Sequence, residues 1–288
     1  MSTRLTAGFF VFMKRIAIQG FHGSFHHEAA ELYFGADTQV VECATFRETF
    51  KSAANAKLSD GGLVAIENSI AGSILPNYNL LQKSNLHVTG EIFLQIKQNL
   101  LVNHGVELKD IHEVQSHPMA LLQCVDFLEK RQWKLVETDD TALSAKNIKQ
   151  HHSTHIAAIA SRFAAKLYDL HVIAPNIHSA KRNFTRFLVV EPERSFKLQG
   201  DENKASLYFE TEHTQGSLAR VLTIVADNGI NLSKLQSFPI PGSDWKYYFH
   251  ADMEFEKADV FQKTVKQIEG KTSALKVYGV YKKGVTHE

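Results

Sequence analysis

Short apolar runs alternate with amphipathic stretches over the first two thirds of the chain, and this alternation is the strongest constraint on its fold. The runs predicted to be strands cover residues 15–19, 62–66, 112–115, 133–136, 155–160 and 170–173. The stretches predicted to be helices cover residues 26–33, 142–150 and 161–167, and one more begins at Pro118. Because alternating strands and helices pack in layers, we expect an α/β fold.

Two extended segments divide this pattern into two blocks. They lie near residues 88–94 and again near residues 172–179. We therefore expect two α/β lobes around a cleft, the architecture of two-lobed periplasmic binding proteins. This architecture by itself does not separate an enzyme from a sensor of small molecules.

Composition excludes several classes of partner. The chain has 288 residues, 44% of them apolar and 22% charged, which fits about two soluble globular domains. The formal charge is +1 and no basic block stands out, so neither nucleic acid nor an anionic membrane is expected as a partner. Cys43 and Cys124 cannot form a disulfide framework, and we expect inert core thiols in a reducing cytoplasm.

The first residues are predicted to lie outside the fold. Residues 7–13 are apolar but too short to span a bilayer, and Lys14 and Arg15 after them bring no small-residue cleavage site. We expect residues 1–12 to be a tail, or the product of a start upstream of an initiator at Met13.

A glycine loop at residues 20–25 joins the first predicted strand to the first predicted helix. Such a loop can hold an anion, because unpaired N–H groups and the positive end of the helix dipole face it. It is neither GxGxxG nor GK[ST], which argues against a nucleotide. A purely structural turn fits this loop equally well.

Polar residues follow two of the predicted strands. Glu67, Asn68 and Ser69 stand at the carboxyl end of an apolar run, where ligands bind in open α/β sheets, although a capping loop is an equal alternative. His117 precedes Pro118 at a helix start and is either an acid or base, or the cap of that helix.

Three histidines, His151, His152 and His155, form an HHxxH cluster. This spacing lacks the register of a helical zinc site and brings no obvious further ligand, so a solvated loop is expected.

The pentapeptide Asn183-Phe184-Thr185-Arg186-Phe187 combines an amide, a hydroxyl and a permanent cation with two aromatic rings. Such a set can hold a carboxylate while it protonates a neighbouring group. Alone, it also fits an ordinary edge strand whose arginine faces solvent.

Five motifs in order carry a resemblance to a known family: GSFHHEAA (23–30), AIENSIAGS (65–73), SHPMALLQC (116–124), AAIAS (157–161) and NFTRF (183–187). Together they resemble the catalytic domain of prephenate dehydratase over residues 14–190. The resemblance implies a carbon–oxygen lyase that converts prephenate to phenylpyruvate in phenylalanine biosynthesis. Because the loss of CO2 and water makes the ring aromatic, it implies no metal and no cofactor.

The resemblance also implies roles for residues of the cleft. Thr185 would donate to the leaving hydroxyl and Arg186 would clamp a carboxylate bidentately, while Asn68 and Ser69 would be further donors. The rest of the expected site comprises Ser24 as a donor, Phe25 and Phe187 as walls for the ring, Glu67 to orient Asn68 or a loop amide, and His117, Ser161 and Asn183.

A polar linker at residues 191–202 precedes a second domain at 204–284. Its predicted order is strand, helix, strand, strand, helix, strand, which is the ferredoxin-like βαββαβ unit. It resembles an ACT domain, the regulatory module of this family, and this implies L-phenylalanine as the effector. The implied effector residues are Gly216, Ser217, Leu218, Ala219, Asn231, Leu232, Gln236, Ser237, Phe238 and Pro239. Where the family has Glu and Arg in its Glu-Ser-Arg-Pro motif, this chain has Gln236 and Phe238.

Two alternatives to prephenate turnover stay open, an arogenate dehydratase and a sensor, and the resemblance also implies an oligomer. Arogenate carries an ammonium where prephenate has a keto group, and at Asn79 this chain lacks the acid that the family commonly has. A non-catalytic sensor with the same two lobes would bind without turnover. ACT modules generally pair, so the resemblance implies a homodimer or a homotetramer.

Overall fold

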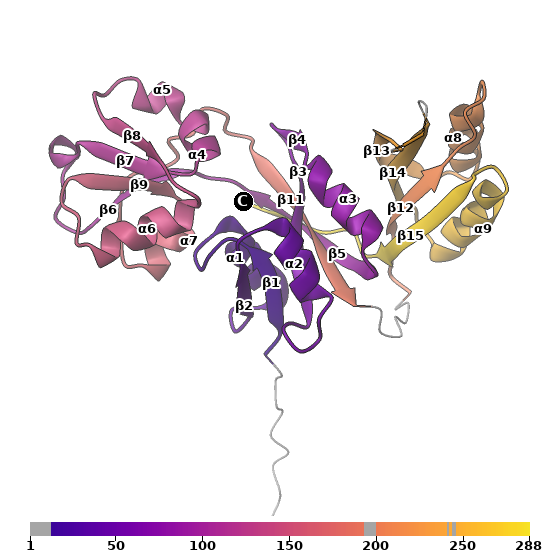
Figure 1. The fold of residues 1–288 in the computed structure, drawn as a ribbon, viewed down its shortest axis with the longest axis horizontal. Helices are drawn as coiled ribbons and strands as arrows, with labels where there is room; N and C mark the ends of the chain where they lie inside the picture. The colour runs from indigo at the N-terminus through magenta and orange to yellow at the C-terminus, as the bar shows by residue number, and fades with distance from the viewer. Residues whose placement is uncertain (1–12, 193–199, 241, 244–245) are drawn as a thin grey trace, which may run out of the picture.

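The computed structural model describes residues 13–192, 200–240, 242–243 and 246–288. The predicted tail at 1–12 and the middle of the predicted linker, 193–199, lie outside these ranges. The described chain forms two α/β lobes and a C-terminal domain side by side, with the first lobe in the middle (Figure 1). The predicted α/β class and the two lobes are confirmed.

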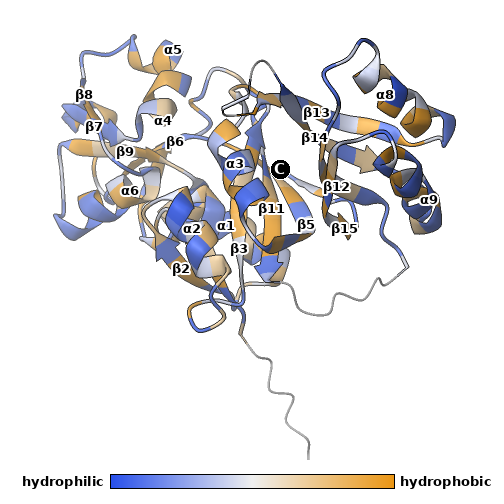
Figure 2. Cartoon of the chain, turned by 45° about the vertical axis from the view of Figure 1, so that its right-hand side comes forward, coloured by the Kyte–Doolittle hydropathy of each residue, from blue (hydrophilic) through white to orange (hydrophobic). Residues whose placement is uncertain are grey.

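The first lobe contains a seven-stranded mixed sheet in the order β16-β5-β11-β3-β1-β2, with β4 paired to β3. Its strands are β1 (Arg15–Gln19), β2 (Gln39–Cys43), β3 (Gly61–Asn68), β4 (Gly72–Ser73), β5 (Leu86–Gln95), β11 (Phe184–Pro192) and β16 (Thr286–His287). Its helices are α1 (Phe25–Phe34), α2 (Phe46–Ala53) and α3 (Leu75–Lys83). In Figure 2 the central strands β3 and β11 are largely apolar, whereas α2 is largely polar.

The second lobe contains a five-stranded sheet in the order β10-β6-β9-β7-β8. Its strands are β6 (Asn99–Val102), β7 (Glu113–Ser116), β8 (Lys134–Glu137), β9 (Ile156–Ala160) and β10 (His171–Ala174). Its helices are α4 (Pro118–Gln123), α5 (Val125–Leu128), α6 (Thr141–Gln150) and α7 (Arg162–Leu167), with a 3-10 turn at Leu108–Asp110. Cys124 lies buried between α4 and α5, and burial raises the pKa of its thiol to about 12, as expected of an inert core cysteine.

One prediction about a connection is wrong. Residues 88–94 belong to β5 in the first lobe, and the chain crosses to the second lobe only at residues 96–98, before β6. The return crossing, predicted near residues 172–179, follows β10 and covers residues 175–183, so that prediction overlaps the observed segment. The edge-strand alternative for the pentapeptide is also wrong, because β11 pairs with β3 on one side and with β5 on the other.

The C-terminal domain has the predicted βαββαβ order and an antiparallel sheet, β13-β14-β12-β15. Its elements are β12 (Lys204–Glu210), α8 (Ser217–Asp227), β13 (Asn231–Pro239), β14 (Tyr247–Glu254), α9 (Ala258–Glu269) and β15 (Ala274–Tyr281). Alternate residues of β12 face opposite ways. Leu207 and Phe209 pack in the core that includes α8 and α9 residues, whereas Tyr208 packs in a core shared with the first lobe.

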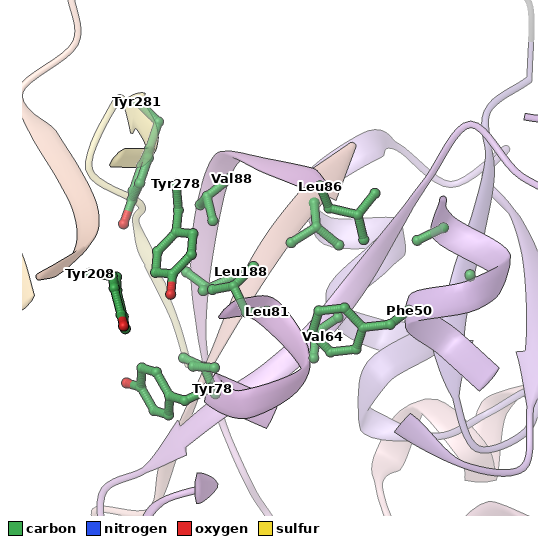
Figure 3. Packing of buried hydrophobic residues seen from close by; sticks show 14 of the residues in the cluster. Phe50, Val64, Tyr78, Leu81, Leu86, Val88, Leu188, Tyr208, Tyr278 and Tyr281 are labelled. Carbon is green, nitrogen blue, oxygen red and sulfur yellow. The ribbon is translucent and has the colours of Figure 1, made fainter. Parts of the chain in front are cut away.

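This shared core joins the C-terminal domain to the first lobe. Tyr208, Tyr278 and Tyr281 of the C-terminal sheet pack with Tyr78 and Leu81 of α3 in one buried cluster (Figure 3). Both faces of the C-terminal sheet are therefore covered, one by its own helices and one by the first lobe. The two domains share a hydrophobic core rather than being connected only by the linker.

Candidate active site

A cavity of about 250 Å³ lies between the two lobes. It sits where β1, β3 and β7 end, the edge at which open α/β sheets bind ligands. Six of the residues predicted from the sequence line it: Ser24, Phe25, Asn68, His117, Thr185 and Phe187.

Asn68 and Thr185 form the polar centre of this cavity. They are direct partners across β3 and β11, and Asn68 Nδ2 donates a hydrogen bond to Thr185 Oγ1 at 3.1 Å. The Asn68 amide is oriented by two backbone donors, since Ile70 N and Ala71 N both donate to its Oδ1 at 2.9 Å. With its oxygen accepting from Asn68, the Thr185 hydroxyl keeps its proton available for a ligand.

Asn183 and Ser69 support this pair from outside the cavity. Asn183 is fully buried, accepts from Asn68 Nδ2 at 2.7 Å, and donates to Gln123 of the second lobe at 3.2 Å. Ser69 Oγ accepts from Phe184 N at 2.9 Å and donates to Arg182 O at 3.2 Å. The structure thus places both residues in the scaffold of the pair, whereas the sequence had suggested that Ser69 and Asn183 contact the substrate directly.

Arg186 does not lie beside Thr185 in the cleft, contrary to the sequence prediction. Its side chain leaves β11 on the other face of the sheet, where Nε donates to Glu91 at 2.6 Å, Nη1 pairs with Asp252, and Nη2 donates to Tyr281 Oη at 3.1 Å. Burial disfavours its charge, but Asp252, Tyr281 and Glu91 hold the pKa of Arg186 well above its usual value. This guanidinium is fully engaged by the C-terminal domain and β5.

Glu67 also lies outside the cleft, because its side chain leaves the sheet on the same face as that of Arg186. It is the cross-strand partner of Arg186, and its carboxylate binds Lys234 Nζ of β13 at 2.5 Å. A β-bulge at this point lets Ala65 and Asn68, three residues apart on β3, both line the cavity. The sequence predicted that Glu67 orients Asn68 or a loop amide, whereas in the structure its carboxylate contacts the C-terminal domain.

The glycine loop lies against the second lobe. A Cβ on Gly20 would lie 3.0 Å from Asp140 Oδ2, and one on Gly23 would lie 3.1 Å from the Tyr168 ring, so the loop approaches more closely than other residues allow. Ser161 caps α7 and donates to Gly23 O at 3.5 Å. It lines a neighbouring cavity of about 460 Å³ rather than the one around Thr185.

Sequence reasoning missed two titratable residues of the cavity. His26 packs edge-on against Phe187, with 4.9 Å between ring centroids, and burial lowers its pKa to about 3, so it is neutral. Asp140 caps α6 by accepting from Ala142 N and Leu143 N, and burial raises its pKa against these hydrogen bonds. A helix over residues 142–150 was predicted, but no sequence signal places Asp140, at its start, in the cleft.

His117 has the capping role that its sequence left open, and it also lies in the cleft. It caps α4 by accepting from Met119 N at 3.2 Å, and it also lines the cavity. Asn79, in contrast, faces the C-terminal domain and accepts from Tyr248 Oη at 2.5 Å. Asn79 therefore lies outside the cavity.

The predicted effector residues separate into two places. Ser217 and Leu218 line a surface cavity of about 320 Å³ at the start of α8, where Gly216 adopts a positive φ of 76°. Phe238 instead stacks on Tyr248 in the shared core, and Gln236 Oε1 accepts from Ser73 Oγ of the first lobe at 3.2 Å. Residues 236–239 do not line the cavity at α8.

Within the described ranges, no group of three or more His, Cys, Asp or Glu side chains is arranged to hold a metal ion. None of the described helices is long and apolar enough to cross a membrane.

The fold and the site define a two-lobed α/β protein with a polar cleft for a small molecule and an attached βαββαβ domain. Residues 16–195 match the prephenate dehydratase family. Arogenate dehydratase/prephenate dehydratase 2 of Arabidopsis thaliana is 36% identical over 277 residues, 93% of this chain and 72% of that protein. The bifunctional chorismate mutase/prephenate dehydratase of Aquifex aeolicus is 33% identical over 277 residues, 95% of this chain and 75% of that protein.

Solved structures share this fold. GqqA, named as a novel type of quorum quenching acylase, superposes with a TM-score of 0.84 at 25% identity, over 94% of this chain and 98% of that one. Prephenate dehydratase of Arthrobacter aurescens, in complex with L-Phe, has a TM-score of 0.79 at 24% identity, over 93% and 89% of the two chains. The chain belongs to the prephenate dehydratase family, and its activity is that of a lyase acting on prephenate.

Proposed function

We propose that the interlobe cleft converts prephenate to phenylpyruvate, with Thr185 as the hydrogen-bond donor to the leaving hydroxyl. The observation that carries the assignment is the bond from Asn68 Nδ2 to Thr185 Oγ1, which directs the threonine proton away from Asn68. In the reaction the bond from the ring to its carboxylate breaks, the carboxylate leaves as CO2, and the electron pair of that bond enters the ring. The ring C–O bond breaks at the same time, and the leaving hydroxide takes up a proton, which comes from solvent through the Thr185 hydroxyl, to become water. A donor fixed at that oxygen stabilises the charge that develops on it.

Substrate anchoring is assigned to the start of α1 rather than to Arg186. Ser24 caps α1, and Ser24 and Phe25 both line the cavity, so the positive end of the helix dipole faces it. A carboxylate of prephenate would bind there. Phe25 and Phe187 would enclose the ring, because both rings line the same cavity.

The test is a phenylpyruvate assay on the purified full chain with prephenate, beside the Thr185→Ala and Thr185→Ser variants. Turnover that falls in Thr185→Ala and is largely retained in Thr185→Ser supports the assignment. Wild-type turnover in Thr185→Ala would reject it. Binding of prephenate by the wild-type chain with no turnover would instead identify a sensor.

Arogenate is the second candidate substrate, and Asp140 is the observation that favours it. This carboxylate lines the cavity and is the kind of group that an ammonium requires. Asp140→Asn keeps a residue that can cap α6 but removes the charge. If arogenate is a substrate, its turnover should fall more in Asp140→Asn than the turnover of prephenate.

We further propose that residues 204–284 form an ACT domain, and that L-phenylalanine bound to this domain inhibits the turnover of prephenate. Support comes from the βαββαβ order, from the cavity at Ser217 and Leu218, and from the L-Phe bound by the Arthrobacter protein. Asn231 and Leu232, at the start of β13, and Ala219 of α8 belong to the same proposed region. The assay with and without millimolar L-phenylalanine tests this part separately from catalysis.

The proposed assembly is a homodimer or homotetramer in the cytoplasm, formed through the C-terminal domains. Within the described sheet, β13 pairs only with β14, so its other edge is open to a second copy. Light scattering on the purified chain, with and without L-phenylalanine, measures the oligomer.

A further inference from the structure

The cleft pair and the residues that contact the C-terminal domain are neighbouring cross-strand pairs of β3 and β11. Thr185 is paired with Asn68, and the next pair is Arg186 with Glu67, whose side chains point to the C-terminal domain. Both members of this second pair bind that domain, Arg186 through Asp252 and Glu67 through Lys234. The backbone of the cleft pair is thus bonded to residues that the C-terminal domain holds.

Lys234 also holds the hairpin that orients Asn68. Besides Glu67, its ammonium donates to Ser73 Oγ of β4 at 2.6 Å. Ser73 is the cross-strand partner of Glu67, and the residues between them include Ile70 and Ala71, whose N–H groups fix the Asn68 amide. One side chain of β13 therefore bridges both strands of the hairpin that sets the direction of the Asn68 donor.

We propose that Lys234 is a positioning residue for the dehydratase reaction. By holding Glu67 and Ser73, it fixes the Asn68 amide, and through it the direction of the Thr185 hydroxyl. The Lys234 side chain is 14% exposed and that of Glu67 is 30% exposed, so water screens this pair only in part. A misplacement of a catalytic group by about 1 Å can lower a rate by roughly 100-fold.

The same strand leads to the proposed effector region. Gln236, two residues after Lys234 on β13, contacts Ser73 as well. A movement of β13 on effector binding would therefore reach Thr185 through the same hairpin. The positioning role rests on the proposed function of Thr185, and this last step rests in addition on the proposed effector; the positioning role itself applies without any effector.

The experiment compares Lys234→Gln, Lys234→Arg and Glu67→Gln, each alone, with the double variant Glu67→Gln/Lys234→Gln. Turnover of prephenate is measured on the full chain without L-phenylalanine. Lys234→Gln should lower kcat about tenfold while KM changes less than about twofold, and Lys234→Arg should recover most of kcat. Because Lys234 acts partly through Glu67, the losses of the two single variants should not multiply in the double variant, which should exceed the loss of Glu67→Gln only by the part that runs through Ser73. Multiplicative losses in the double variant would overturn the proposal.

Lys276→Gln is the matched control. Lys276 also reaches the first lobe from the C-terminal sheet, donating to Ser84 O at 2.9 Å, but at the far end of α3. It should keep the wild-type kcat, and an equal loss of kcat in this variant would show a general effect of docking and overturn the proposal. Ser73→Ala is the second variant if Lys234→Gln does not fold. It removes one partner of the Lys234 ammonium and should lower kcat severalfold. A wild-type kcat in a folded Ser73→Ala would refute the role of Lys234. Prephenate turnover by the wild-type chain keeps this test separate from the assignment of the activity itself.

Discussion

Thr185 and Arg186 are consecutive residues of β11 whose side chains leave the sheet on opposite faces. Thr185 lines the interlobe cavity, and Arg186 binds Asp252 in the C-terminal domain. Successive side chains of a strand alternate in this way, so a strand between two domains presents every second residue to each. The strand that carries the proposed donor is therefore also the strand on which the C-terminal domain docks.

Thr185→Ala should lower kcat by a factor of about 100 to 1,000. The basis is the loss of one preorganised donor at a developing oxyanion, about 3 to 4 kcal/mol of transition-state stabilisation. Steady-state kinetics on prephenate measure the effect, with circular dichroism as the check on folding. A loss below about tenfold with unchanged KM would contradict the role of Thr185.

Arg186→Leu should reduce stability far more than it reduces affinity for prephenate. Without the Arg186 cation, the carboxylates of Glu91 and Asp252 stay buried but lose an ion-pair partner. Removing one partner of a buried ion pair lowers the free energy of unfolding by about 3 to 5 kcal/mol. Urea unfolding of Arg186→Leu and of Asp252→Asn measures this, and both should be destabilised. If Arg186 clamped a substrate carboxylate, a stable Arg186→Leu would instead show a large rise in KM with no change in unfolding.

The start of α6 shows which features can be predicted from the sequence. Residues that act locally were predictable, because a cap such as Asp140 is set by the few residues around it. The placing of Asp140 in the cleft depends on the approach of Gly20 from the other lobe, over 100 residues away, and no local pattern encodes that distance.

The error at Arg186 has a different cause. The pentapeptide was predicted to bring Thr185 and Arg186 to the same ligand, whereas β11 begins at Phe184 and contains four of its residues. Strand alternation then separates Thr185 from Arg186. The partner of Arg186 could not be predicted either, because Asp252 belongs to a domain that the linker at 191–202 suggested was separate.

His250 should make the protein less stable as the pH falls from 6.5 to 4. It is 2% exposed in the shared core, and burial lowers its pKa to about 4. Between these pH values the unfolded chain binds a proton that the folded chain does not, so the free energy of unfolding falls with falling pH, by roughly 3 kcal/mol for this group. His250→Phe removes the titrating group, so the midpoint of urea unfolding should depend less steeply on pH over this range. An unchanged slope would show that His250 does not titrate differently on folding.

Gly279→Ala should separate β15 from β5. A Cβ at Gly279 would lie 1.8 Å from the backbone oxygen of Val88, and neither backbone can rotate away as a flexible side chain would. Inserting one methyl group into such a contact costs about 1 to 3 kcal/mol or more, and here it acts on the junction between the C-terminal domain and the first lobe.

Gly270→Ala is the control for this substitution. Gly270 has an ordinary right-handed conformation after α9, and nothing lies within 4 Å of its added Cβ, so it should be neutral or slightly stabilising. Thermal unfolding compares the two variants, and equal midpoints would mean that β15 and β5 are not in contact at Gly279. If Gly279→Ala is destabilised yet folded, its kcat should fall with little change in KM, because the first lobe would lose the contacts that hold Glu67 and Arg186. A destabilised Gly279→Ala with wild-type kcat would show that docking of the C-terminal domain stabilises the fold without setting the geometry of Thr185.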